Sequence, residues 1–480
     1  MAPHLALPLA RAIPISDPLH ALRALRGLPY PFLLHSSLED QRARWSFFGA
    51  DPFVVHRGGD HDDAVAEFRA LAARATEGEP RGSLVPFSGG AVGYWAYEFG
   101  RRLERWRVEP GARIAEDDLG LPDFVIGFYD VVGVFDHRAR EAWWLSSGLP
   151  EEGAARRARA AERLARFEAL IDWPSLGHAP PGAPPDRVLE ARSNFHPDDY
   201  RRAIERVRES IRSGDLFQAN LSQRWTVAHD SPDPGATAAA LFESLARLSP
   251  APFAAFLGCG DHAIASASPE RFLERRRGRV EARPIKGTRP RHADPTMDAR
   301  ALSELITSAK DRAENVMIVD VLRNDLGRVC GAGSVEVPEL CALETFAQVH
   351  HLTSTVTGRL AAGRDAFDLL AACFPGGSIT GAPKIRAMEL LDTLEPHRRH
   401  LYTGAIGYVD WNGDADWNIA IRTATVTGSA ILFSAGGGIT AESDPDAEYE
   451  ETLHKAEGLR LAISAALGPV ALAPAAAHSS

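Results

Sequence analysis

Three charged residues in one predicted helix have a spacing that could bind a metal ion or an anion. Glu448, Glu451 and Lys455 lie at intervals of three and four residues, so a helix over residues 446–459 places them on one face. A stripe of this kind is most often a solvent-exposed helix face. By itself this pattern therefore favours a surface helix over a site.

A second pair of acidic residues, Asp311 and Glu314, has the same three-residue spacing within residues 308–328. An apolar run begins directly after this pair, and carboxylates at the edge of a buried segment are costly to desolvate without a partner. Two carboxylate pairs on two helices fit Mg²⁺, which prefers oxygen ligands and keeps water for a substrate. The sequence thus predicts a magnesium site built from two helices.

One lysine, Lys286, lies in an arginine-rich segment, residues 283–291. A surface position is the ordinary expectation for a lysine. Burial next to other cations would instead lower its pKa and make it a nucleophile. Glu270 lies sixteen residues upstream, and the pattern alone assigns it no acid–base role.

Two glycine-rich segments could contact a ligand. Residues 374–384 resemble a phosphate loop, but Ala382 and Pro383 stand where Lys and Ser or Thr are required, so a nucleotide site is excluded. The Ser378 hydroxyl and the N–H groups at the start of the following helix could still bind a carboxylate. Residues 434–440 contain three consecutive glycines, which fit either a turn or a backbone that approaches a ligand closely.

The elements around these residues mix helices and strands. Short Gly/Asn/Asp turns between strands favour an α+β fold with large mixed antiparallel sheets flanked by helices, rather than a doubly wound parallel sheet. Helices are expected at residues 151–169, 196–212, 297–328 and 446–465. Strands are expected at residues 124–135, 141–145, 280–285, 404–409, 419–426 and 430–434.

Composition excludes several classes of protein. The 480 residues carry a net charge of −11, which disfavours a nucleic-acid partner. No apolar run is long enough for a membrane span, and the N-terminus lacks the features of a signal peptide. The four cysteines show no metal or disulfide spacing, so buried thiols and a cytoplasmic location are expected.

A Pro- and Gly-rich stretch divides the chain. Residues 174–190 are predicted to be a linker between an N-terminal region, residues 1–173, and a catalytic domain, residues 191–468. Residues 469–480 are expected to form a flexible tail.

Seven segments occur together in the order known from one enzyme family: SPERF, PIKGTRPR, SAKDRAEN with VDVLRNDLGR, VHHLTS, FPGGSITGAPK, GYVDWNGDADWNIAIRTA and AEYEETLHKAEG. The chain therefore resembles the chorismate-utilising enzymes, which include anthranilate, aminodeoxychorismate, isochorismate and salicylate synthases. The resemblance covers nearly the whole chain and implies one large α+β body rather than independent domains.

The resemblance also implies roles for individual residues. Glu314 and Glu451 match ligands of Mg²⁺, with Glu448 and Asp311 as their neighbours on the same helix faces, and Glu270 matches the general acid that assists departure of the C4 hydroxyl of chorismate. Positions that match substrate-binding residues are Thr288, His351, Ser378, Tyr408, Arg422, Gly436, Gly437, Gly438 and Lys455.

Two positions divide the family by chemistry. Gln218 stands where isochorismate and salicylate synthases have a lysine that activates water, and an amide cannot act as that base. Lys286 stands where anthranilate synthases usually have Ala, whereas in aminodeoxychorismate synthases this lysine is the proposed nucleophile. The resemblance therefore implies amination of chorismate at C4, on the way to 4-aminobenzoate, with anthranilate synthesis as the alternative.

The resemblance implies two further ligands. A glutaminase would need a Cys in a Gly-x-Cys-x-Gly elbow, which this chain lacks, so ammonia is expected from a separate glutamine amidotransferase subunit. Residues 33–36 and 250–254 match the regions that form a tryptophan pocket in relatives. His35 replaces the acidic residue common there in anthranilate synthases, which weighs against feedback inhibition.

Overall fold

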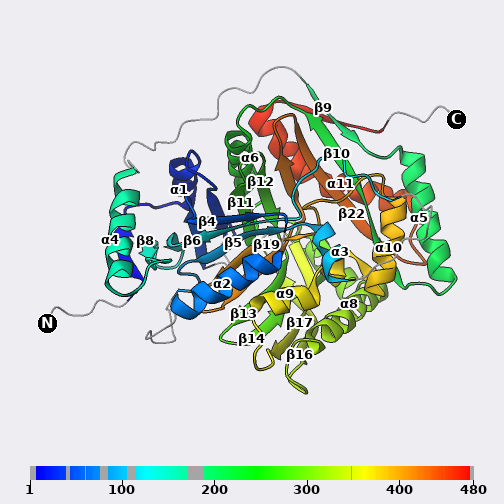
Figure 1. The fold of residues 1–480 in the computed structure, drawn as a ribbon. Helices are drawn as coiled ribbons and strands as arrows, with labels where there is room; N and C mark the ends of the chain where they lie inside the picture. The colour runs from blue at the N-terminus through cyan, green and yellow to red at the C-terminus, as the bar shows by residue number, and fades with distance from the viewer. Residues whose placement is uncertain are drawn as a thin grey trace.

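The structure is a computed structural model that describes residues 7–38, 44–59, 61–75, 85–104, 114–170, 188–346 and 349–475. Two large β-sheets face each other and are covered by helices on their outer sides (Figure 1). One apolar cluster lies between the sheets, and one lies under the helices on each outer face. The predicted α+β class with large mixed antiparallel sheets is confirmed.

The larger sheet has thirteen strands among the described residues. In spatial order they are β1 (Leu9–Ile13), β8 (Glu141–Ser146), β7 (Val131–Asp136), β3 (Trp45–Gly49), β2 (Phe32–His35), β11 (Phe253–Gly258), β12 (Ala263–Ser268), β21 (Thr423–Val426), β22 (Ala430–Ile439), β10 (Gln218–Ala228), β9 (Leu189–Ser193) and β23 (Val470–Ala473), with β18 (Gly381–Ala382) beside β10. Neighbouring strands are antiparallel except for β9 and β23.

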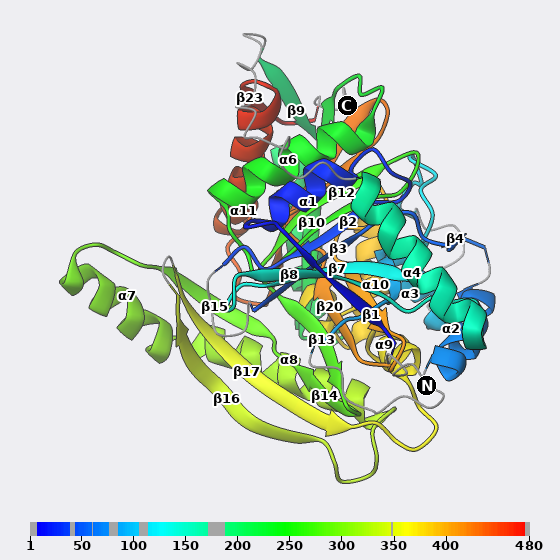
Figure 2. The ribbon, with the colours of Figure 1, turned by 90° about the vertical axis from the view of Figure 1, so that its left-hand side faces the viewer.

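The second sheet has ten strands among the described residues. Their order is β15 (Ile285–Pro290), β17 (Val349–Arg359), β14 (Arg279–Ala282), β13 (Arg271–Arg276), β20 (Ala415–Ile419), β19 (Ala405–Asp410), β5 (Gly90–Trp95), β6 (Phe124–Tyr129) and β4 (Val54–Arg57), with β16 (Glu336–Thr345) beside β17. The β16–β17 pair forms a long ribbon at one end of the sheet, next to β15 (Figure 2).

Helices cover the outer faces of both sheets. The larger sheet carries α1 (Pro18–Leu25), α4 (Gly153–Leu170), α6 (Pro234–Leu248) and α11 (Pro445–Leu467), while α5 (Pro197–Arg212) and α10 (Lys384–Leu394) pack against β10. The smaller sheet carries α2 (His61–Ala75), α7 (Pro295–Thr307), α8 (Ala309–Gly327) and α9 (Ala366–Cys373), and the short helices are η1 (Tyr97–Phe99), α3 (Gly100–Leu103) and η3 (Gly377–Ile379).

Strands from the two predicted regions interleave in both sheets. N-terminal β2 pairs with β11 of the predicted catalytic domain, and N-terminal β5 pairs with β19. The hydrogen-bonded ladders therefore run across the predicted boundary, and the two regions form one body. Most of the predicted linker, residues 174–187, lies outside the described residues, and its last positions begin β9.

The predicted flexible tail begins with an ordered strand, so the prediction of flexibility is wrong for its first residues. Val470–Ala473 forms β23 and pairs in parallel with β9. The sequence ALA has no strong strand signal, but the open edge of β9 provides unpaired backbone groups, and pairing satisfies them. Residues 476–480 lie outside the described part.

Four predicted segments are interrupted. The run at 124–135 is two strands, β6 and β7, which belong to different sheets and are separated by buried Asp130, whose carboxylate pairs with Arg163 at 3.0 Å. The predicted helix at 297–328 breaks at Ser308, whose side chain caps α8. The predicted strands at 280–285 and 419–426 are likewise each divided between two strands.

Among the described residues, no helix combines the length and the apolar character that crossing a membrane requires.

Candidate active site

A cavity of about 870 Å³ opens where the two sheets meet. Its walls come from β22 of the larger sheet, from β15 and β17 of the smaller one, and from α8 and α11. Predicted site residues that line it are Glu270, Lys286, Thr288, Glu314, His351, Ser378, Arg422, Gly436, Gly438, Glu448, Glu451 and Lys455. Residues separated by up to 185 positions in the chain thus face one space.

Lys286 and Glu270 are connected by Ser378. The Lys286 Nζ donates to the Ser378 carbonyl oxygen at 3.1 Å, and the Ser378 Oγ donates to Glu270 Oε1 at 3.0 Å. Glu270 follows β12 and is buried, Lys286 lies in β15, and Ser378 lies in η3. The amine and the carboxyl group are thereby fixed on one side of the cavity.

Burial shifts the pKa of both groups toward their neutral forms. It lowers the pKa of Lys286 below its usual value, although the charges of Glu314 and Glu270 oppose this change. It raises the pKa of Glu270, and the opposing effects of Lys286 and of the Ser378 hydrogen bond are smaller. A neutral amine is a nucleophile and a protonated carboxyl group is an acid, so the pair suits a displacement with an assisted leaving group.

His351 and Thr288 form a second polar pair in the wall. The two residues are cross-strand partners in β17 and β15, and Thr288 Oγ1 lies 2.8 Å from His351 Nδ1. Burial and the charge of Arg422 lower the pKa of His351 to about 4, so its ring is neutral near pH 7. It can therefore exchange hydrogen bonds with a polar ligand without adding charge.

The three glycines belong to a strand, not to a turn. Gly436, Gly437 and Gly438 lie within β22, opposite β10. A Cβ atom at Gly438 would lie 1.9 Å from Gln218 Nε2, and one at Gly437 would lie 2.9 Å from Glu448 Oε2. Only glycine lets the strand pass this close to the side chains, which leaves backbone exposed toward the cavity.

The acidic residues meet on the other side of the cavity. Glu314 comes from α8, whereas Glu448 and Glu451 come from α11. Lys455 Nζ lies 2.6 Å from Glu451 Oε1 and also donates to the Gly436 carbonyl oxygen at 2.8 Å. Burial raises the pKa of Glu314. For Glu451 burial acts in the same direction, but the attraction of Lys455, Lys310 and Lys286 together outweighs it, so its pKa is lower than usual.

The donor set fits Mg²⁺ in its chemistry. The carboxylates of two helices face the cavity beside the bare backbone of β22, and oxygen ligands of this kind are those that Mg²⁺ prefers. Among the described residues, no three His, Cys, Asp or Glu side chains are drawn together closely enough to enclose a metal ion. Instead, the Lys310 ammonium lies 3.5 Å from Glu448 Oε1 and 4.0 Å from Glu314 Oε1.

Comparison with known proteins identifies the family. The model of the chorismate binding enzymes matches residues 30–460. This chain belongs to the chorismate-binding enzyme family. Aminodeoxychorismate synthase component 1 of Salmonella typhimurium is 44% identical over 452 residues, which are 91% of this chain and 93% of the relative.

Anthranilate synthases are also similar to this chorismate-binding enzyme. Anthranilate synthase component 1 of Cereibacter sphaeroides is 38% identical over 448 residues, covering 88% of this chain and 86% of the relative. The crystal structure of anthranilate synthase component I from Streptococcus pneumoniae superposes with a TM-score of 0.73 at 30% identity, covering 88% of this chain and 93% of that one. The solved anthranilate synthase component I thus shares the fold described above.

Tyr408 does not line the cavity that holds the other predicted site residues, which corrects its prediction as a substrate-binding residue. Its hydroxyl accepts a hydrogen bond from Arg276 at 2.6 Å, and its ring packs against Phe47 and Phe87 between the sheets. Tyr408 lines a different cavity of about 310 Å³. A motif match fixes a position in the sequence, but strand geometry decides which side of a strand a side chain occupies.

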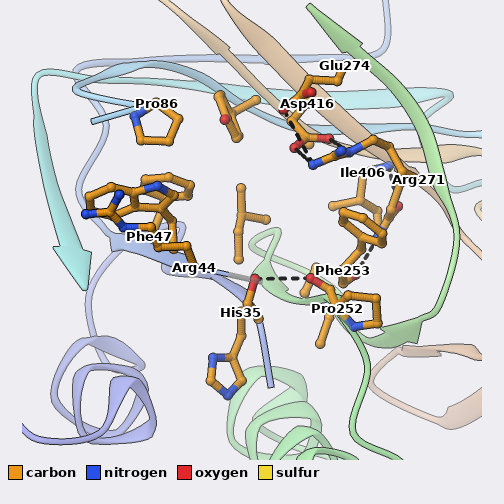
Figure 3. A pocket seen from close by; sticks show the side chains of 18 of the residues that line it. His35, Arg44, Phe47, Pro86, Pro252, Phe253, Arg271, Glu274, Ile406 and Asp416 are labelled. Atoms are coloured by element: carbon orange, nitrogen blue, oxygen red, sulfur yellow. Dashed lines mark hydrogen bonds and ion pairs between the residues drawn. The ribbon is translucent and has the colours of Figure 1, made fainter. Parts of the chain in front are cut away.

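The second cavity joins the two segments predicted to form a tryptophan pocket. His35 and Pro252 lie on one side of it, and Arg271 on the other points toward Asp416 at 2.9 Å (Figure 3). Burial and the neighbouring His137 lower the pKa of His35 to about 3, so its ring is uncharged near neutral pH. Tryptophan binding there stays a prediction.

Asn220, Tyr402 and Lys310 are among the residues that line the active-site cavity of this chorismate-binding enzyme and were not predicted from the sequence. Asn220 and Tyr402 line it from β10 and from the loop before β19, and Lys310 lines it from α8. Tyr402 and Asn220 show no sequence signal, because their positions depend on how β10 packs against the loop. Lys310 did have a sequence signal, because it lies one helical turn before Glu314.

Proposed function

We propose that this protein aminates chorismate at C4 to form 4-amino-4-deoxychorismate, as the synthase component of an enzyme that supplies 4-aminobenzoate. The observation that carries the proposal is the pairing of Lys286 with Glu270 through Ser378 in the cavity wall. The similarity to aminodeoxychorismate synthase components over about nine tenths of the chain supports it.

The proposed chemistry consists of two displacements. The neutral amine of Lys286 attacks C2 of chorismate, the ring double bonds shift, and the C4–O bond breaks as Glu270 gives its proton to the departing hydroxyl group, releasing water. Ammonia then attacks C4, the double bonds shift back, and the C2–N bond to Lys286 breaks. The proton lost by the nitrogen at C4 can return to the pair, so the site ends in its starting form.

The negative charge of chorismate can be balanced by two cationic side chains and by backbone groups. Arg422 and Lys455 face the cavity beside the Gly436–Gly438 backbone, where they can bind the two carboxylates of chorismate. Glu314, Glu448 and Glu451 would hold Mg²⁺, which, when bound, neutralises a substrate carboxylate.

Gln218 argues against water as the nucleophile. It is buried in β10, and its amide packs against Gly438. An amide has no basic lone pair with which to deprotonate water, so formation of isochorismate or salicylate is not expected.

Ammonia is expected from a partner subunit. Cys259, Cys330 and Cys373 are buried, and burial raises the pKa of each thiol. Cys341 is only partly exposed, and its sequence context is not a nucleophile elbow. None of the four therefore resembles the nucleophile of a glutaminase, and we propose that a separate glutamine amidotransferase supplies the nitrogen.

The product of the reaction tests this proposal. Purified protein is incubated with chorismate, Mg²⁺ and ammonium, and the products are separated by chromatography and identified by mass spectrometry. We expect 4-amino-4-deoxychorismate, which an added lyase converts to 4-aminobenzoate. Anthranilate as the product would favour the second candidate, anthranilate synthase component 1, to which the chain is 38% identical in Cereibacter sphaeroides.

A further inference from the structure

The acidic residues around the cavity differ in the cationic side chains with which they pair. Asp311 pairs with Arg289 at 3.1 Å, and Glu451 pairs with Lys455 at 2.6 Å. Glu314 and Glu448, by contrast, share the ammonium of Lys310, which lies 4.0 Å from the first and 3.5 Å from the second, while Glu314 also interacts with the charge of Lys286. These two carboxylates come from different helices, α8 and α11, so Lys310 bridges the helices.

The two carboxylates are much less exposed than the lysine that pairs with them. Glu448 is buried, and its Oε1 accepts a hydrogen bond from Ser443 at 2.7 Å. The Glu314 side chain is 15% exposed, but that of Lys310 is 50% exposed. A half-exposed lysine on the first turn of a helix can move its ammonium into solvent without disturbing its backbone.

We propose that Lys310 is a built-in counterion for the magnesium site, which holds Glu314 and Glu448 together before Mg²⁺ binds and is displaced when it does. Two cations cannot occupy the space between the same two carboxylates, because they would repel each other within a few ångströms. The inference rests on the proposed function only in taking Mg²⁺ as the metal, and it does not depend on which product is formed.

Two consequences follow. Without Lys310, Glu314 and Glu448 repel each other in the free protein, so the metal-free form is less stable. Mg²⁺ then no longer competes with an internal cation, so it binds more tightly. Loss of one unit charge a few ångströms from the site should tighten Mg²⁺ binding on the order of tenfold.

Labelling of lysines in the unaltered protein tests the displacement directly. The chain has only four lysines, Lys286, Lys310, Lys384 and Lys455. The full chain is treated briefly with an amine-acetylating reagent, with and without Mg²⁺ and without chorismate, and each lysine is quantified by mass spectrometry. We expect Mg²⁺ to increase labelling of Lys310 several-fold and to leave labelling of Lys384, whose side chain is 10% exposed and pairs with Asp325, unchanged. Labelling of Lys310 that stays constant or falls would overturn the proposal.

A matched pair of variants tests the energetics by calorimetric titration with Mg²⁺ alone. Lys310→Gln should lower the Kd for Mg²⁺, and Lys310→Arg should keep it close to that of the unaltered protein. Arg312→Gln removes the same charge from the exposed side of α8 and should change the Kd by less than about twofold. Equal effects of Lys310→Gln and Arg312→Gln, or weaker binding in Lys310→Gln, would contradict the inference. An enzyme that makes anthranilate but shows the expected Kd pattern would overturn the proposed function and leave this inference standing.

Discussion

The Ser378 hydroxyl donates a hydrogen bond to Glu270 Oε1 at 3.0 Å, and the carbonyl of the same serine accepts from Lys286 at 3.1 Å. One residue of a short helical turn therefore sets the separation between the proposed acid and the proposed nucleophile. The proposed acid and the proposed nucleophile are therefore already held in position before substrate binds, which is what preorganisation means.

Ser378→Ala should shift the pH dependence of the reaction. The Ser378 hydrogen bond lowers the pKa of Glu270, so its loss raises that pKa, and the descending alkaline limb of the profile moves to higher pH. The rate should fall about tenfold or less, the usual effect of one lost hydrogen bond. Ser378→Thr keeps the hydroxyl and should restore the profile. A profile of kcat/KM against pH, with free-base ammonia held constant, checks both.

Glu270→Gln should remove the descending limb. The amide cannot supply a proton, so kcat should drop by about a hundred- to ten-thousandfold. The residual rate should rise with pH as Lys286 loses its proton. Because the charge of Glu270 raises the pKa of Lys286, the ascending limb should move to lower pH in the variant. A bell-shaped profile that persists in Glu270→Gln would exclude it as the acid.

Lys286→Met should abolish formation of 4-amino-4-deoxychorismate while chorismate still binds. A loss of at least about a hundredfold is expected for a missing nucleophile. Stability offers a second measurement: the pKa of Lys286 is lowered in the folded protein, so between that lowered pKa and the unfolded value of 10.5 the unfolded chain binds more protons. The stability of the unaltered protein relative to the variant should therefore rise as pH rises toward that value. Full activity in the variant would show that Lys286 is no nucleophile.

Tyr408→Phe and Tyr402→Phe should separate the two cavities. Tyr402 lines the active-site cavity, so its loss should reduce kcat/KM. Tyr408 lines the other cavity, so Tyr408→Phe should change turnover by less than about twofold while costing about 1 kcal/mol of stability from its bond to Arg276. Steady-state kinetics and denaturation of both variants give the comparison, and a large kinetic loss in Tyr408→Phe would restore it as a substrate-binding residue.

Arg399→Met should destabilise the protein strongly. Arg399 and Glu395 are both buried and pair at 2.7 Å, and Arg399 also donates to the Ile379 carbonyl next to the cavity. Removing one partner leaves a buried unpaired charge, which costs about 3–5 kcal/mol. Arg398→Met breaks the more exposed pair with Asp117 and should cost less than about 1 kcal/mol. Guanidinium denaturation midpoints of the two variants should differ accordingly.

Local chemistry in the sequence predicted much of the site. Glu448, Glu451 and Lys455 fall on one helix face because α-helical periodicity fixes their spacing, and α11 bears this out. The order of seven motifs identified the family without any structure. The cavity also brings together Lys286, Glu270 and Ser378, whose relation no spacing rule could have given.

What the sequence determined by itself is local: which segments form helices and strands, which residues can donate, accept or attack, and that no cysteine stands in a Gly-x-Cys-x-Gly elbow. Tertiary structure alone decided that the run at 124–135 divides between two sheets, that residues 470–473 complete a sheet edge, and that Tyr408 faces another cavity. The physical reason is that these outcomes depend on strand pairing and burial between segments far apart in the chain. Such contacts override weak local preferences, because the free energy of packing and backbone pairing exceeds that of intrinsic propensity.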